Sequence, residues 1–354
     1  MSKPRLRDLG ITPGLLPPGR LNAITDVAGV RVGTASLVSD TPHVVRTGVT
    51  AIWPRGPEIW HDYCFAGTHS FNGNGEMTGL PWIAEQGLLG APICITNTYS
   101  VGTVRDAICA VAVRDGATQA FHLPVAAETY DGWLSESERF PVTTDLAFQA
   151  LDGASAGPVA EGNTGGGTGM ICHEFKGGTG TSSRLAAVDG ASYTVGALVQ
   201  ANYGDRDLFR VDGVPVGRHI GRDIVPSHRT MPREAGSIIV ILATDAPLLP
   251  IQCQRLARRA TTGLAWVGGI GSNGSGDIFL AFSTANHIHA GAPISPARML
   301  APEAMTALFQ AAAEATEEAI LNALVAAETM TGRDGRTVHA LPHDRLVNAM
   351  RRPR

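Results

Sequence analysis

The chain has 354 residues, of which 44% are hydrophobic and 17% charged, and its formal net charge is −4. This composition is typical of a globular protein with one large domain or two, and it argues against a nucleic-acid-binding protein, which usually shows a basic excess. No apolar run approaches the length of a membrane span, and the N-terminus lacks the apolar core of a signal peptide. The five cysteines are scattered without Cys-x-x-Cys spacing, so we expect small buried hydrophobes in a cytoplasmic protein.

The first half of the chain alternates apolar strand-like runs with short helical patterns after a Pro/Gly-rich entry. We expect strands at 28–37, 45–52, 92–96 and 123–130, a segment around 64–72 that leads into a glycine-rich turn, and helices ending near 86, at 100–114 and at 143–151. Ser100 and Thr143 are candidate helix caps.

The second half begins with the glycine-rich segment Glu161–Gly169. We expect strands at 182–188, 192–202, 237–244, 264–268 and 277–284, and helices at 247–263, 302–330 and 343–351. Residues 204–235 show no clean period, and connections of that length tend to be functional or disordered. Strands grouped with helices in this way predict a layered α+β domain with mixed or antiparallel sheets.

The dipeptide Gly236-Ser237 is the most informative feature, because it places a serine at the start of an apolar, β-branched strand directly after a long polar loop. If the bond between them were cut, Ser237 would carry a hydroxyl nucleophile and a free α-amine. An α-amine has a pKa of roughly 7.7–8, so it could act as the base for its own hydroxyl, as in N-terminal nucleophiles. The alternative is an ordinary strand after a turn, since Gly-Ser also occurs at Gly271-Ser272 and Gly274-Ser275.

Other motifs point away from cofactors and metals. Gly269–Gly274 matches G-x-G-x-x-G, but a strand-like run follows it where a dinucleotide site needs a helix. Gly162–Gly169 lacks the Gly-Lys-Ser/Thr ending of a P-loop. His287 and His289 have no further ligand at useful spacing, so we expect no metal and no cofactor.

Five polar residues at strand ends are candidates for catalysis, each with a structural alternative. Ser275 and Asp277 share a strand face and could form a proton network, or belong to a polar hairpin turn. Glu128 and Tyr130 could supply a carboxylate and a phenolic donor, or mark the end of a strand. Asn202 could donate to an oxyanion, or be a turn residue.

A set of segments in this order resembles one family over nearly the whole chain. The segments are Asn72–Gly79, Ile95–Gly102, Glu128–Asp131, Glu161–Met170, Phe175–Gly178, Gly236–Val240 and Ala243–Leu248. The family is that of the self-processing L-aminopeptidase/D-amino-acid esterase–amidases, which also contains the β-peptidyl aminopeptidases. The resemblance implies a four-layer αββα fold shared with ornithine acetyltransferases. It also implies one catalytic domain, residues 1–354, that cleaves itself into an α-chain 1–236 and a β-chain 237–354 and assembles as a tetramer of αβ heterodimers.

Carried over by position, the resemblance makes Ser237 the nucleophile and Ser275 with Asp277 its hydrogen-bonded network. Asn202 and Tyr130 match the oxyanion-stabilising pair, and Glu128 matches the acid that holds the substrate's free amine. Whether the Ser237 α-amine or the Ser275 network acts as the base is left open.

The function that the resemblance implies is a serine aminopeptidase that releases N-terminal residues, including D- or β-amino acids, from small peptides, amides or esters. One alternative is an amide hydrolase for a specialised metabolite of the pantetheine type. Acetyl transfer between ornithine derivatives is disfavoured, because those fold relatives use a threonine where this chain has Ser237. A non-catalytic binding module with the same fold is the alternative from another class.

Overall fold

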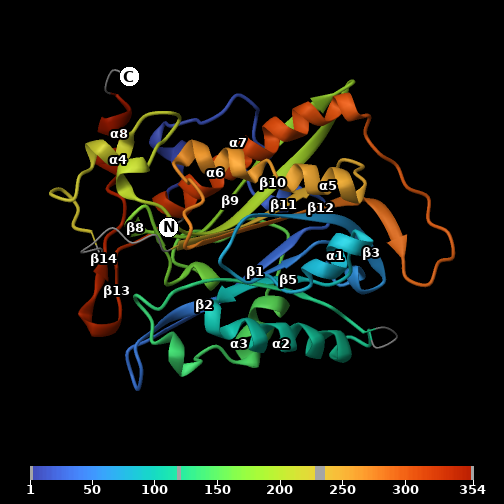
Figure 1. The fold of residues 1–354 in the computed structure, drawn as a ribbon, viewed down its shortest axis with the longest axis horizontal. Helices are drawn as coiled ribbons and strands as arrows, with labels where there is room; N and C mark the ends of the chain where they lie inside the picture. The colour runs from blue at the N-terminus through green and yellow to red at the C-terminus, as the bar shows by residue number, and fades with distance from the viewer. Residues whose placement is uncertain (1–2, 118–120, 228–235, 352–354) are drawn as a thin grey trace.

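The computed structural model describes residues 3–117, 121–227 and 236–351, and shows two β-sheets packed face to face with helices on both outer sides (Figure 1). One sheet has the order β1 (Arg31–Ser39), β2 (Val45–Trp53), β5 (Ile93–Asn97), β6 (Val125–Thr129). The other has the order β4 (Leu88–Leu89), β3 (Asp62–Gly73), β12 (Ser275–His289), β11 (Gly236–Thr244), β10 (Ala191–Asn202), β9 (Gly178–Val188).

Helices α2 (Val101–Arg114) and α3 (Thr144–Asp152) cover the four-stranded sheet. Helices α5 (Pro250–Ala257), α6 (Ala260–Val267) and α7 (Met305–Val325) cover the six-stranded sheet (Figure 1). Shorter elements are α1 (Leu80–Gln86), α4 (Val216–His219), α8 (His343–Met350), the hairpin of β7 (Ile171–Cys172) with β8 (Phe175–Lys176), and the hairpin of β13 (Met330–Thr331) with β14 (Thr337–Val338). The expected four-layer αββα sandwich is confirmed.

Strand β11 lies in the middle of the six-stranded sheet and is buried on both faces. Ile238, Val240 and Leu242 enter the core between this sheet and its helices. Ile239 and Ile241 enter the core between the two sheets. A strand buried on both faces needs apolar residues at every position, which explains the unbroken apolar run after Ser237.

The strand expected at 264–268 was wrong, and the helix expected at 247–263 is divided in two. The structure has two helices instead, with a break at Arg258 and Arg259. In α6, Leu264 and Val267 are buried while Trp266 is exposed, which is the burial pattern of an amphipathic helix. A short apolar run of this kind cannot be assigned to helix or strand by periodicity alone.

The two expected helix caps differ in outcome. The Thr143 hydroxyl accepts a hydrogen bond from the Leu146 amide at 3.3 Å and caps α3 as predicted. Ser100 makes no side-chain cap. The chain enters α2 through a 3-10 turn, Thr98–Ser100, and the Asn97 side chain caps this turn by accepting from the Tyr99 amide at 3.0 Å. In the long connection 204–235, the described part contains α4, and residues 228–235 lie outside the described part.

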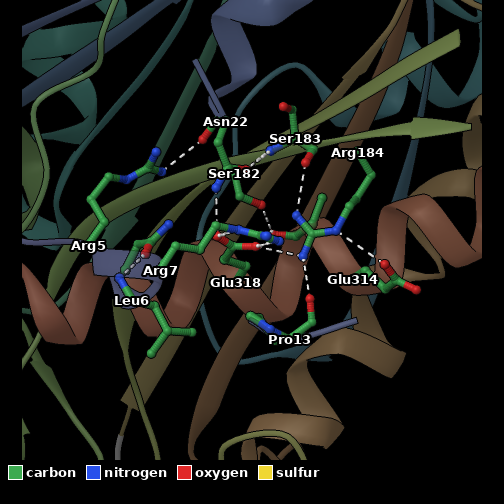
Figure 2. A network of polar contacts seen from close by, with 12 residues as sticks. Arg5, Leu6, Arg7, Pro13, Asn22, Ser182, Ser183, Arg184, Glu314 and Glu318 are labelled. Atoms are coloured by element: carbon green, nitrogen blue, oxygen red, sulfur yellow. Dashed lines mark hydrogen bonds and ion pairs between the residues drawn. The ribbon is translucent and has the colours of Figure 1, made fainter. Parts of the chain in front are cut away.

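A buried ionic network joins the start of the chain to α7 (Figure 2). Arg184 of β9 is fully buried and donates to Glu318 at 2.6 Å and to Glu314 at 3.2 Å. Glu318 also accepts from Arg7 at 2.8 Å and from Asn22 at 2.6 Å. Each buried charge has several partners, which offset its desolvation penalty. Removing one partner leaves the remaining buried charge without part of that compensation.

We therefore expect Glu318→Ala to lower the free energy of unfolding by about 3 kcal/mol, since it removes a principal partner of the buried Arg184. Denaturant unfolding followed by circular dichroism measures this. The matched control is Glu328→Ala, whose 70% exposed carboxylate pairs with Lys3 and should cost less than about 1 kcal/mol. Equal losses in the two variants would contradict the role assigned to the network.

Candidate active site

Ser237 lies near the start of β11, between the end of β10 and the start of β12. In the strand register it pairs with Asn202 on one side and with Gly276 on the other. Its hydroxyl donates to the Gly236 carbonyl at 2.6 Å and accepts from the Gly276 amide at 3.2 Å. The side chain is thus held beside the carbonyl of its own preceding peptide bond.

Gly236 is required by close packing. A Cβ atom at this position would lie 2.8 Å from the Asn202 carbonyl oxygen and 2.8 Å from the Tyr203 Cα. Both contacts are with backbone, which cannot move aside as a flexible side chain can. Only glycine therefore lets the chain enter β11 so close to the end of β10.

Ser275 and Asp277 form a buried pair, as the two-residue spacing predicts. The Ser275 hydroxyl donates to the Asp277 carboxylate at 2.6 Å. Burial raises the pKa of Asp277 to about 6, and the hydrogen bonds from Ser275 and from the Ile238 amide only partly offset it. Among the described residues, no hydrogen bond joins this pair to the Ser237 hydroxyl, which reaches the intervening Gly276 amide instead.

The Asn202 side chain is fixed by two backbone groups. Its Oδ1 accepts from the Ile171 amide at 2.8 Å, and its Nδ2 donates to the Tyr130 carbonyl oxygen at 3.0 Å. These contacts decide which way the amide faces. A side-chain amide has two protons, and within the described residues only the Tyr130 carbonyl takes one, so the other is available next to Ser237.

Tyr130 contributes its backbone to this cluster, while its side chain is 51% exposed. The ring lies over Gly132 and makes an edge contact with Tyr99 at 6.3 Å between centroids. The partial burial of the phenol raises its pKa, so the hydroxyl stays a proton donor at neutral pH. The structure brings the Tyr130 carbonyl to Asn202, and the oxyanion role of its phenol stays a prediction.

Glu128 is a buried carboxylate, 3% exposed, near the end of β6. It accepts hydrogen bonds from the Thr98 hydroxyl and from the Glu76 amide, the latter at 3.0 Å. Burial raises its pKa, and these two hydrogen bonds act in the opposite direction. No cationic side chain among the described residues pairs with it, which leaves it available to an ammonium group.

Sequence reasoning missed the residues that connect Glu128 to Ser237. A Cβ on Gly75 would lie 3.0 Å from the Gly276 Cα and 3.2 Å from a Glu128 carboxylate oxygen. The turn after β3 is thus in close contact with both. Its Asn-Gly-Asn-Gly composition marked a turn, but nothing in the sequence indicated what the turn packs against.

The motifs that were set aside have other structural roles. The chain enters β12 directly after Gly269–Gly274, without the helix that a dinucleotide site requires. His287 contacts Asp62, which is also paired with Arg55. Within the described ranges no group of three His, Cys, Asp or Glu side chains could hold a metal ion, and no helix is long and apolar enough to cross a membrane.

The four-layer sandwich, with a serine and its preceding glycine at the start of a central strand, defines a hydrolase of the N-terminal-nucleophile class. A family model described as peptidase family S58 matches residues 22–338, and the chain belongs to that family.

Known relatives agree with this assignment. The β-peptidyl aminopeptidase BapA of Sphingosinicella microcystinivorans is 49% identical over 361 residues, which cover 97% of this chain and 91% of that protein. A solved β-aminopeptidase from Burkholderia sp. has a TM-score of 0.93 and 52% identity, and covers 99% of this chain and 100% of its own. The solved L-aminopeptidase D-Ala-esterase/amidase of Ochrobactrum anthropi has a TM-score of 0.91 and 45% identity, over 99% of this chain and 98% of its own. That enzyme is described as a prototype for the serine aminopeptidases, with a new variant of the Ntn-hydrolase fold. This chain is accordingly a serine aminopeptidase with that fold.

The raised pKa of Asp277 predicts a pH-dependent cost in stability. Its folded pKa of about 6 lies above the ordinary 3.8, so the folded state holds the proton more tightly and loses stability as pH rises through that window. Asp277→Asn cannot ionise. We therefore expect its melting temperature, relative to the parent protein, to improve steadily between about pH 4 and about pH 7. A difference that does not change with pH would contradict this.

Proposed function

We propose that the chain cleaves its own Gly236–Ser237 bond and that the freed Ser237 is the nucleophile of the aminopeptidase. The observation that carries the proposal is the Ser237 hydroxyl, which lies 2.6 Å from the Gly236 carbonyl oxygen at the rigid start of a core strand. A hydroxyl at this position is next to the carbonyl carbon that an N→O acyl shift attacks. The products are an α-chain 1–236 and a β-chain 237–354.

The cleavage proceeds in two balanced steps. The Ser237 Oγ bonds to the Gly236 carbonyl carbon, the peptide C–N bond breaks, and the hydroxyl proton ends on the new α-amine. Water then hydrolyses the ester, which releases the Gly236 carboxylate and restores the hydroxyl. The close approach of Gly236 to the end of β10 supports this, because a bulkier residue there would displace the carbonyl.

Substrate hydrolysis reuses the same hydroxyl. Ser237 attacks the carbonyl of the substrate's N-terminal residue, and the free Asn202 proton and the Tyr130 phenol stabilise the oxyanion. The scissile C–N bond then breaks, the proton taken from Ser237 passes to the leaving amine, and water hydrolyses the acyl-enzyme to release the amino acid. A donor of this kind contributes about 3–4 kcal/mol in comparable sites. The proton from Ser237 passes either to its own α-amine or toward the Ser275–Asp277 pair, whose raised pKa of about 6 suits it to proton exchange near neutral pH.

We further propose that Glu128 binds the substrate's free ammonium group and that the enzyme accepts β-amino acid residues. Two relatives that are 49% and 52% identical to this chain are named as a β-peptidyl aminopeptidase and a β-aminopeptidase. The pantetheine-type alternative has no comparable support. A tetramer of αβ heterodimers in the cytoplasm completes the proposal. The five free cysteines, all buried except the partly exposed Cys109, fit a reducing compartment.

Intact-mass analysis under denaturing conditions tests self-cleavage. We expect two species that sum to the precursor plus one water, with the smaller beginning at Ser237. Ser237→Ala should give one full-length species without hydrolytic activity. The control is Ser272→Ala in the Gly271-Ser272 pair. Ser272 is not one of the proposed catalytic residues, so this variant should be processed normally. A cleaved and active Ser237→Ala variant, or an uncleaved parent protein after long incubation, would refute the proposal.

Substrate kinetics test the role of Glu128. Glu128→Gln should raise the KM for an amino-acid p-nitroanilide about 10- to 100-fold, since a hydrogen bond to a charged group contributes about 1.5–3 kcal/mol. In the parent enzyme KM should rise as pH falls through the Glu128 pKa, and the variant should lose this dependence. Glu76→Gln, an exposed neighbour, is the control. An unchanged KM in Glu128→Gln would rule out the ammonium contact.

A further inference from the structure

Lys176 of β8 is a fully buried lysine for which the proposed mechanism has no use. Its ammonium donates to the backbone carbonyls of Met170 at 2.7 Å, Gly177 at 2.9 Å and Gly167 at 3.5 Å. No carboxylate among the described residues forms an ion pair with it, and burial lowers its pKa to about 7. Burying an amine that has only backbone carbonyls as partners costs free energy, and the lowered pKa expresses that cost.

The peptide unit between Met170 and Ile171 connects this lysine to the oxyanion donor. Its carbonyl oxygen accepts from Lys176 Nζ and from the Gly177 amide at 2.9 Å. Its N–H donates to Asn202 Oδ1 at 2.8 Å. Lys176 and Asn202 therefore hold opposite ends of one rigid peptide plane.

The β7–β8 hairpin places the Lys176 side chain against this peptide. β7 and β8 are joined by His173 and Glu174, which both adopt the left-handed conformation, with φ of 48° and 64°. Neither residue is a glycine, so the turn is strained, and such strain persists only when the surroundings enforce it. The tight turn pairs Ile171 with Lys176 and brings the ammonium back onto the Met170 carbonyl.

We propose that Lys176 is a positioning residue for the oxyanion site. Lys176 holds and polarises the Met170–Ile171 peptide through its carbonyl oxygen. The N–H of that peptide in turn holds and polarises the Asn202 amide, whose remaining proton is the oxyanion donor. Hydrogen bonds in such a chain strengthen one another. The inference rests on the proposed function, because Asn202 must be the oxyanion donor.

The test is a double-mutant cycle with Lys176→Met and Asn202→Ala, measured on enzyme whose cleaved, active fraction has been titrated. Lys176→Met should lower kcat about tenfold with KM changed by less than about twofold, because the oxyanion forms only in the transition state. In the Asn202→Ala background the same change should lower kcat by less than about twofold, because residues that act through one another are not additive.

Ile171→Pro is the second variant. It removes the N–H that reaches Asn202 and leaves Lys176 in place, and proline is tolerated at the first residue of a strand. It should reproduce the loss in kcat, and it decides the question if the Lys176 variant does not fold. Ser182→Ala, which removes a buried hydrogen bond from β9 to the Ala315 carbonyl of α7, controls for lost stability and should keep kcat.

The outcomes distinguish the positioning role of Lys176 from the oxyanion role of Asn202. If Asn202→Ala lowers kcat and the Lys176→Met effect is additive to it, the positioning role is overturned and the oxyanion assignment stands. An unchanged kcat in Ile171→Pro overturns the positioning role as well. If Asn202→Ala leaves kcat unchanged, the oxyanion assignment falls and the inference falls with it.

Discussion

The pairing of β11 with β10 and β12 is the constraint on which the rest of the site depends. β11 is buried on both faces and lies between β10 and β12 in the six-stranded sheet. Its register with these two strands places Ser237 opposite Asn202 and Gly276. The side chain of Ser237 is therefore held in a more precise position than that of a serine on a surface loop.

The buried carboxyl groups around Ser237 lower the stability of the folded protein, and hydrogen bonds offset part of that cost. Burial raises the pKa of Glu128 and of Asp277, which means that the charged forms are disfavoured inside the protein. Hydrogen bonds from Thr98, from the Glu76 amide and from Ser275 recover part of this cost. The buried ionic network around Arg184 lies between β9 and α7, so the network and the site share the six-stranded sheet.

Much of the secondary structure followed from local pattern, because the strands of this protein are apolar, β-branched and bounded by glycine or polar turns. The failures are equally local. Residues 264–268 are apolar enough for a strand, yet 264–267 form the end of α6, which packs on α7, and Gly268 caps that helix. Ser100 is an ordinary cap residue by type, yet its side chain makes no cap hydrogen bond at the start of α2, which follows a 3-10 turn.

The sequence by itself determined that a glycine and a serine begin a buried strand, and that Ser275 and Asp277 share one face of another. Both follow from the two-residue period of a strand and need no distant contact. Only the tertiary structure decided that Asn202 and the Tyr130 backbone lie beside Ser237, and that Glu128 is connected to its neighbour Gly276 through Gly75. The same holds for Lys176, which reaches Asn202 through one peptide. These contacts depend on sheet register, on the packing of two sheets and on a strained two-residue turn. They join residues far apart in the chain, and the local pattern of a sequence does not contain them.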